Sequence, residues 1–207
     1  MKKILGIDCG WSKPGFALVE IRTTAPGTVV YSECFETHAM AGKQRKKLSV
    51  KKYADDARRV IELSDKIAEV CSTYRPDVVV VEMPTSGGQS ASALKGMCMG
   101  AATLVATLRR VGITPIMITP TQNKHAAGGD KELEKQRVVD SVKAVWPDYA
   151  GWPRMKKYKD RFDNESCWAI ADALSCILTV LQMPESEESA AMLIKIRVSA
   201  AFRLLSA

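Results

Sequence analysis

Apolar and polar positions along the chain follow two rhythms, one typical of β-strands and one typical of helices. Short apolar runs predict strands over residues 3–8, 16–22, 28–37, 77–82 and 114–118. Apolar residues recur at helical spacing over residues 53–74, 91–110 and 164–181. A helix capped by Asp130 is predicted to run to about Val145, and another over residues 189–205. This order of strands and helices predicts an α/β fold with an extra C-terminal helix.

Three carboxylates stand in stretches that otherwise carry no charge. Asp8 ends an apolar run, Glu82 follows four valines, and Asp172 is the only charged residue between Trp168 and Leu181. A buried carboxylate is costly to ionise unless a donor, a cation or a metal compensates it. Taken singly, Asp8 is explained as a turn cap, and Glu82 and Asp172 as members of ion pairs. Taken together, the three predict one shared partner, a divalent metal.

The composition fits a globular protein of the cytoplasm. The 207 residues are 46% hydrophobic, and no apolar run approaches the roughly 20 residues of a membrane span. The apolar run after Met1 is too short for a signal peptide, so we expect the cytoplasm of a bacterium, or of a host cell for a viral protein. We expect one domain over residues 1–183 and a helical extension over residues 184–207. Six scattered cysteines without a CxxC pair are interpreted as reduced core residues.

Basic residues are concentrated in one segment. The formal net charge is +7, and six of the basic residues fall within ten positions, namely Lys43, Arg45, Lys46, Lys47, Lys51 and Lys52. Such a cationic segment predicts contact with nucleic-acid phosphates. The alternative interpretation is an ordinary solvated loop.

Several of these features together resemble a known family. Residues 6–10 read Gly-Ile-Asp-Cys-Gly, a Gly- and Ala-rich helix follows Glu82, and the late helix contains Ala171-Asp172-Ala173-Leu174. With the segment 119–138, they resemble the RuvC-like Holliday junction resolvases of the RNase H-like superfamily over about residues 3–181. The resemblance implies a five-stranded mixed sheet, with three antiparallel strands and then two parallel strands, flanked by helices.

The resemblance also implies the chemistry of the carboxylates. Two Mg²⁺ ions would support phosphodiester hydrolysis, with Asp8 bridging them and Glu82 and Asp172 binding one each. Ligands that are all oxygen select Mg²⁺, with Mn²⁺ as a substitute, and the chain has only two histidines.

One position departs from the family pattern. Where the family carries a second acidic residue or a histidine, three positions before its last Asp, this chain has Ala169. Glu165 is therefore the expected fourth metal ligand, and Asp163 is the alternative. Lys124 and Lys131 are the candidates for stabilising the scissile phosphate.

The resemblance extends to DNA binding and assembly. The loop after Glu82 is expected to meet the junction centre through Thr85, Ser86 and Gln89, and phosphate contacts are expected from Arg154, Lys156 and Lys157. A homodimer is expected, with the helix after Glu82 at its interface and the small residues Gly96, Gly100, Ala101 and Ala102 allowing close approach.

The function implied is a structure-selective endonuclease that resolves four-way DNA junctions by paired symmetric nicks. One alternative is a related nuclease acting on flaps, forks or RNA. A second is a non-catalytic junction binder, because Ala169 replaces a ligand. A third is the sugar kinase and actin group, whose strand also reads Gly-Ile-Asp-x-Gly. That fold needs a second such domain, and the chain has no second copy of the motif.

Overall fold

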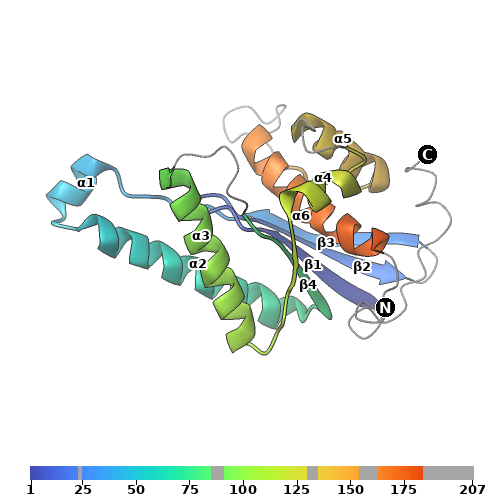
Figure 1. The fold of residues 1–207 in the computed structure, drawn as a ribbon, viewed down its shortest axis with the longest axis horizontal. Coiled ribbons are helices and arrows are strands. Elements are labelled where there is room, and N and C mark those ends of the chain that lie inside the picture. Colours follow the sequence, from blue (N-terminus) through green and yellow to red (C-terminus); the bar gives the residue numbers. More distant parts are fainter. Residues whose placement is uncertain (23–24, 85–90, 130–134, 154–162, 184–207) are drawn as a thin grey trace.

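The computed structural model describes residues 1–22, 25–84, 91–129, 135–153 and 163–183 (Figure 1). Its strands are β1 (Lys2–Asp8), β2 (Gly15–Arg22), β3 (Ala25–Cys34), β4 (Val78–Glu82) and β5 (Ile116–Ile118). Its helices are α1 (Gly42–Lys47), α2 (Lys52–Tyr74), α3 (Ala91–Arg110), α4 (Pro120–Ala126), α5 (Lys135–Val145) and α6 (Asn164–Gln182). The helix predicted over residues 189–205, the extension 184–207 and the predicted cap Asp130 lie outside the described residues.

The five strands form one mixed sheet in the order β3-β2-β1-β4-β5. β1 pairs antiparallel with β2, and β2 pairs antiparallel with β3. β1 pairs parallel with β4, and β4 pairs parallel with β5. The predicted sheet of three antiparallel and then two parallel strands is therefore confirmed.

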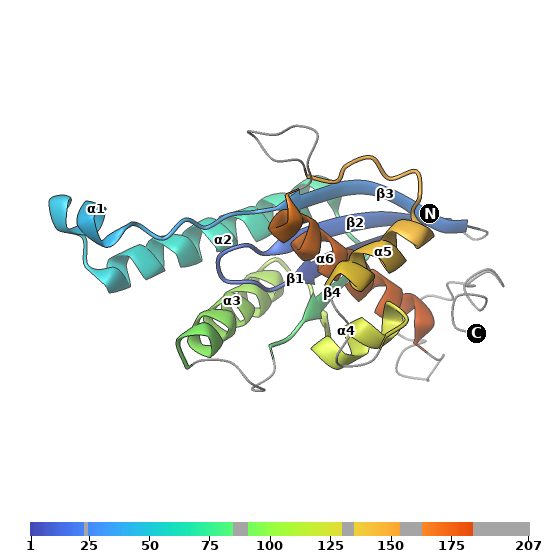
Figure 2. The ribbon, with the colours of Figure 1, turned by 90° about the horizontal axis from the view of Figure 1, so that it is seen from above.

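Helices cover both faces of the sheet, as Figures 1 and 2 show. Alternate residues of the central strands point to opposite faces. Ile4 and Val80 join the core under α4, α5 and α6, whereas Leu5 and Val79 join the core under α2 and α3. The central strands are continuously apolar because neither face meets water.

Helix α6, the longest of the three helices on the face that α4, α5 and α6 cover, lies almost directly on the backbone of β1 and β2. A methyl group added at Gly6 would meet the Ala173 carbonyl oxygen at 1.9 Å, and one at Gly15 would meet the Ala169 carbonyl oxygen at 2.0 Å. No side chain fits at either position unless the helix moves away. Glycine in both strands and alanine in the helix thus set the distance between α6 and the end of β1.

Two short helices were not predicted. The segment 119–129, expected as a polar loop, contains α4, which begins with Pro120 after a capping box formed by Thr119 and Gln122. The basic segment, expected as a loop, contains α1, none of whose residues is buried. Neither helix carries the apolar stripe from which longer helices are recognised.

The six cysteines are free, and Cys98 is exposed, which corrects its interpretation as a core residue. Within the described residues, no helix is both long enough and apolar enough to cross a bilayer.

Candidate active site and nucleic-acid interface

The ends of two parallel strands bring the first two carboxylates together. Asp8 closes β1 and Glu82 closes β4, and the two residues are direct partners in the strand register. Asp8 is two positions after Gly6, which contacts α6, and Glu82 is two positions after Val80, which packs beneath the same helices. By the period of two along a strand, both carboxylates lie on the face that α6 and α4 cover.

Helix α6 adds the third carboxylate. Asp172 lies between Ala171 and Ala173, both fully buried, and Ala173 is the residue whose carbonyl oxygen approaches Gly6. The close contact between α6 and β1 therefore joins Ala173, the residue after Asp172, to Gly6, two residues before Asp8. All three acidic residues are partly exposed, so their shared site is open to solvent ions.

The electrostatics show that the three carboxyl groups affect one another. Burial raises the pKa of Asp8 well above its usual range, and the charges of Asp172 and Glu82 raise it further. Burial and the charge of Glu82 raise the pKa of Asp172 to about 7. Burial also raises the pKa of Glu82. These pKa shifts indicate buried acidic groups whose negative charge is only partly offset.

Lysines near the site supply part of the positive charge that offsets the three carboxylates. Lys135, at the start of α5, lowers the pKa of all three carboxyl groups by its charge. Its Nζ also lies 5.1 Å from the centroid of the Trp168 ring. Lys124 lowers the pKa of Glu82 and Asp172. Sequence reasoning selected Lys124 but missed Lys135, and Lys131 lies outside the described residues.

The side chain of Asn123 lies between β4, which carries Glu82, and α6, which carries Asp172. Its amide nitrogen Nδ2 donates a hydrogen bond to Glu82 Oε2 and another, of 3.2 Å, to the Asp172 carbonyl oxygen. Asn123 is only 2% exposed, and its Oδ1 has no hydrogen-bond partner within the described part of the chain. A buried polar atom left unpaired costs about 1–3 kcal/mol. Sequence reasoning did not single out Asn123.

The residues present fit a hard divalent cation. The acidic side chains offer only oxygen atoms, the ligands that Mg²⁺ and Mn²⁺ prefer, and burial, together with neighbouring negative charge, raises the pKa of Asp8 and Asp172. Within the described residues, no three His, Cys, Asp or Glu side chains already converge closely enough to hold a metal ion.

The two candidates for a fourth acidic ligand have other partners. Glu165 Oε2 accepts a hydrogen bond of 2.6 Å from Lys13 Nζ, and its side chain is 65% exposed. Asp163 precedes α6 and accepts a hydrogen bond of 2.9 Å from Ser166 Oγ. Neither residue has a hydrogen bond to Asp8, Glu82 or Asp172 in the described part of the chain. The fourth ligand therefore stays a prediction.

The basic segment forms a projecting arm, defined here as residues 41–55, which comprises α1 and the first turn of α2. Both ribbon views show it extending beyond one end of the sheet (Figures 1 and 2). Arg45 is partly buried, and the other five basic residues predicted to contact phosphate are exposed, namely Lys43, Lys46, Lys47, Lys51 and Lys52.

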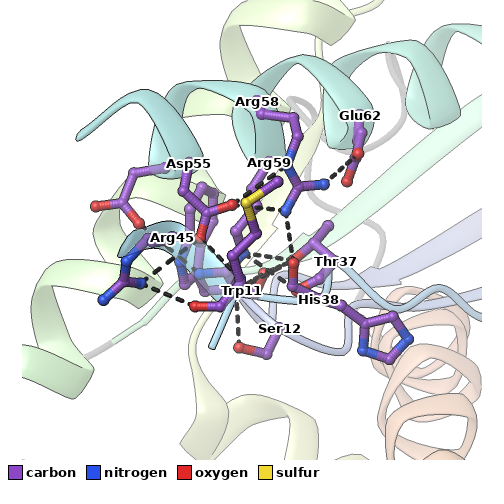
Figure 3. A network of polar contacts seen from close by, with 11 residues as sticks. Trp11, Ser12, Thr37, His38, Arg45, Asp55, Arg58, Arg59 and Glu62 are labelled. Carbon is purple, nitrogen blue, oxygen red and sulfur yellow. Dashed lines mark hydrogen bonds and ion pairs between the residues drawn. The ribbon is translucent and has the colours of Figure 1, made fainter. Parts of the chain in front are cut away.

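A buried carboxylate anchors this arm. Asp55, 1% exposed, accepts hydrogen bonds from the Met40 backbone nitrogen at 2.9 Å and from Arg58 Nη2 at 2.8 Å (Figure 3). Arg45 Nη1 lies 3.9 Å from Asp55 Oδ2 and donates to the Met40 carbonyl oxygen at 3.0 Å. The arm is therefore fixed to α2 at its base.

A buried arginine links α2 to the turn that follows Asp8. Arg59 is 5% exposed, and its guanidinium lies 4.5 Å from the centroid of the Trp11 ring. It donates hydrogen bonds to Ser12 Oγ at 2.9 Å and to the Thr37 carbonyl oxygen at 3.1 Å (Figure 3). The arm and the end of β1 thus share one polar network.

The same turn accounts for two small residues of α3. A methyl group at Gly96 would meet Trp11 Cδ1 at 3.1 Å, and one at Gly100 would meet the Cys9 carbonyl oxygen at 2.8 Å. Packing within one chain therefore explains both glycines, and they lend no support to the predicted dimer interface.

Several predicted DNA contacts fall outside the described residues, namely Thr85, Ser86, Gln89, Arg154, Lys156 and Lys157. Trp146 and Trp152 are buried in the core beneath α6, so neither is available to stack on a base.

Comparison with known proteins agrees with this arrangement. The family model described as crossover junction endodeoxyribonuclease RuvC matches residues 4–147. The RuvC of Christiangramia forsetii is 29% identical over 137 residues, which cover 66% of this chain and 63% of that protein. The RuvC of Ruegeria pomeroyi is 28% identical over 146 residues, which cover 70% of this chain and 78% of that protein. The matched part thus spans less than two thirds of the first relative and more of the second.

Solved structures show the same fold. Thermus thermophilus RuvC superposes with a TM-score of 0.60 at 20% identity, covering 86% of this chain and 92% of that one. A second structure of T. thermophilus RuvC, in complex with a Holliday junction substrate, gives a TM-score of 0.61 at 19% identity with the same coverage. On the strength of the family match over residues 4–147, the chain belongs to the crossover junction endodeoxyribonuclease RuvC family.

Proposed function

We propose that this protein is a Mg²⁺-dependent endonuclease that resolves four-way DNA junctions by paired nicks. The single observation that carries the proposal is the proximity of Asp8, Glu82 and Asp172, shown by the charges of Asp172 and Glu82 that add to burial in raising the pKa of Asp8, in a chain of the RuvC family. Acidic groups that repel one another at a site open to ions are suited to hold divalent cations rather than to stabilise the apo fold.

The chain's own residues have distinct parts in the proposed hydrolysis. Two Mg²⁺ ions, when bound, supply positive charge that activates a water molecule and neutralises the phosphate. Asp8, whose pKa responds to both other carboxylates, would hold these ions together with Glu82 and Asp172. Lys135 and Lys124 supply fixed positive charge beside the acidic residues, where they would stabilise the negative charge that develops on the phosphate. Mn²⁺ is expected to substitute for Mg²⁺.

The projecting arm is proposed to bind a duplex arm of the substrate. Its five exposed lysines lie on a segment that Asp55 holds to α2, so little conformational freedom is lost when phosphates bind. A four-way junction has approximate two-fold symmetry, and two symmetric nicks require two active sites at a fixed spacing. A homodimer with two-fold symmetry supplies this arrangement.

A second candidate function is junction binding without cleavage. The pairing of Glu165 with Lys13 favours it, because this pairing leaves three acidic residues at the centre where four were predicted. A related nuclease acting on flaps, forks or RNA would use the same carboxylates and would differ in substrate.

One experiment distinguishes these functions. The full chain is incubated with a labelled four-way junction, and in parallel with linear duplex, a flap and an RNA–DNA hybrid, each with and without Mg²⁺. The proposal expects paired symmetric nicks in the junction only, only with Mg²⁺, and none with the Asp8→Asn variant. Tight junction binding without nicks would establish the binder, and preferential cutting of another substrate would establish the related nuclease.

A further inference from the structure

We propose that Asn123 is the positioning residue of the acidic centre, which sets the Glu82 carboxylate for the bound cation. This inference rests on the proposed function in one respect only, namely that the three carboxylates bind a divalent cation. It concerns the protein's affinity for the cation in the absence of DNA.

The contacts of the amide group point to this role. Asn123 Nδ2 donates to Glu82 Oε2, on the end of β4, and to the carbonyl oxygen of Asp172, on α6. One –NH2 group therefore connects the two elements that carry two of the three carboxylates. The reverse orientation of the amide would turn Oδ1 toward two acceptor oxygens, so only this orientation is compatible with its neighbours.

The backbone of Asn123 is held as firmly as its side chain. Asn123 lies in the middle of α4, whose first turn is fixed by the capping box of Thr119 and Gln122. Ser175, fully buried in α6, donates from its hydroxyl to the Asn123 carbonyl oxygen at 2.8 Å. The backbone that carries the amide is thus hydrogen-bonded to α6, which holds the amide in place beside Glu82.

The unpaired oxygen of the same amide indicates that stability does not account for this residue. Asn123 is only 2% exposed, yet Oδ1 has no partner among the residues that the structure describes. An apolar side chain of similar shape would remove this unsatisfied atom, but it would also take the Nδ2 donor away from Glu82 Oε2. The amide is explained by what its N–H group does for Glu82, because residues that orient a metal ligand affect affinity through that ligand.

The test compares Mg²⁺ and Mn²⁺ binding by isothermal titration calorimetry, without DNA, in the full chain and in Asn123→Leu. The variant keeps the size of the side chain and removes both its donor and its unpaired acceptor. We expect affinity to fall on the order of tenfold or more, while the thermal midpoint of unfolding in EDTA falls no further than in the Ser175→Ala control described next. An unchanged affinity, or an affinity loss explained by a lower midpoint in EDTA, would overturn the proposal.

Two further variants keep the inference testable if leucine does not fit. Asn123→Ala removes the amide without added bulk and must show the same loss of affinity. Ser175→Ala, the matched control, removes the hydroxyl bound to the Asn123 carbonyl oxygen without touching Glu82, and should change affinity much less.

A double-mutant cycle separates positioning from general structural support. In a Glu82→Gln background, replacing Asn123 should cost no further affinity, because the residue it positions is already altered. A full additional loss in that background would show that Asn123 acts independently of Glu82 and would refute the inference. If the unmodified chain binds neither cation, the proposed function fails. If the unmodified chain binds a cation and the Asn123 variants bind it equally well, only the role of Asn123 fails.

Discussion

Removing one negative charge from the acidic centre should stabilise the cation-free protein. The pKa of Asp172 moves from 3.8 to about 7 on folding, mainly through burial and secondly through Glu82. A tenfold change in proton affinity corresponds to about 1.4 kcal/mol, so the shift corresponds to about 4 kcal/mol when the carboxyl group is ionised. Because Asp172 keeps part of its surface in water, we reduce this figure to about 2 kcal/mol.

The direction with pH follows from the protons bound in each state. Between about pH 4 and pH 7 the folded protein holds the Asp172 proton more tightly than the unfolded chain, so the free energy of unfolding falls as pH rises through this window. The Asn side chain of the Asp172→Asn variant cannot ionise, so this contribution to the fall in the free energy of unfolding is absent from the variant. In EDTA we therefore expect the variant to match the unmodified protein near pH 4 and to exceed it by about 2 kcal/mol near pH 8.

Urea unfolding in EDTA at about pH 4 and about pH 8, repeated with Mg²⁺, measures the effect. Mg²⁺ should stabilise the unmodified protein more than the variant, because a ligand that binds only the folded state adds to its stability. Asp148→Asn, at an exposed position, is the matched control and should show no such dependence. Our reasoning would be refuted if Asp172→Asn were less stable than the unmodified protein at about pH 8 in EDTA.

Three further predictions concern activity and binding. Glu82→Gln should abolish Mg²⁺-dependent cleavage while leaving junction affinity in a gel-shift assay unchanged, and residual cleavage would remove Glu82 from the centre. Replacing Lys46 and Lys47 with Gln should lower the slope of log affinity against log salt by about 2, whereas Arg109→Gln, at the far end of α3, should not. Lys135→Met should slow single-turnover cleavage on the order of 10²-fold with little change in junction affinity, and an equal loss of affinity would make Lys135 a binding residue.

The sheet and its long helices were predictable because their apolar patterns extend over many residues. The valines before Glu82 identify a strand covered on both faces, and this interpretation also fixed the place of Glu82 at a strand end. Helix α1 escaped prediction because none of its residues is buried. Helix α4 had a readable start at Thr119 and Pro120, but its seven residues are too few to show a periodic face.

The acidic centre was predictable only as far as its residues are unusual in their local sequence. Asp8, Glu82 and Asp172 interrupt apolar stretches, and the structure brings them together electrostatically. Asn123 is polar within a polar segment, so nothing local distinguishes it. The partner of Glu165 is Lys13, 152 positions away along the chain, and such a pairing arises only from the folded arrangement of β1, β2 and α6.

Arg59 links the projecting arm, proposed to bind DNA, to the turn beside the proposed catalytic residue Asp8. Arg59 donates to Ser12 and Thr37 and stacks on Trp11, only three residues after Asp8. Helix α2 and the Arg59 guanidinium thus connect the lysines proposed to bind phosphate with the turn that follows β1. Under the proposed function, duplex bound at the arm would therefore help to fix the position of Asp8 at the end of β1.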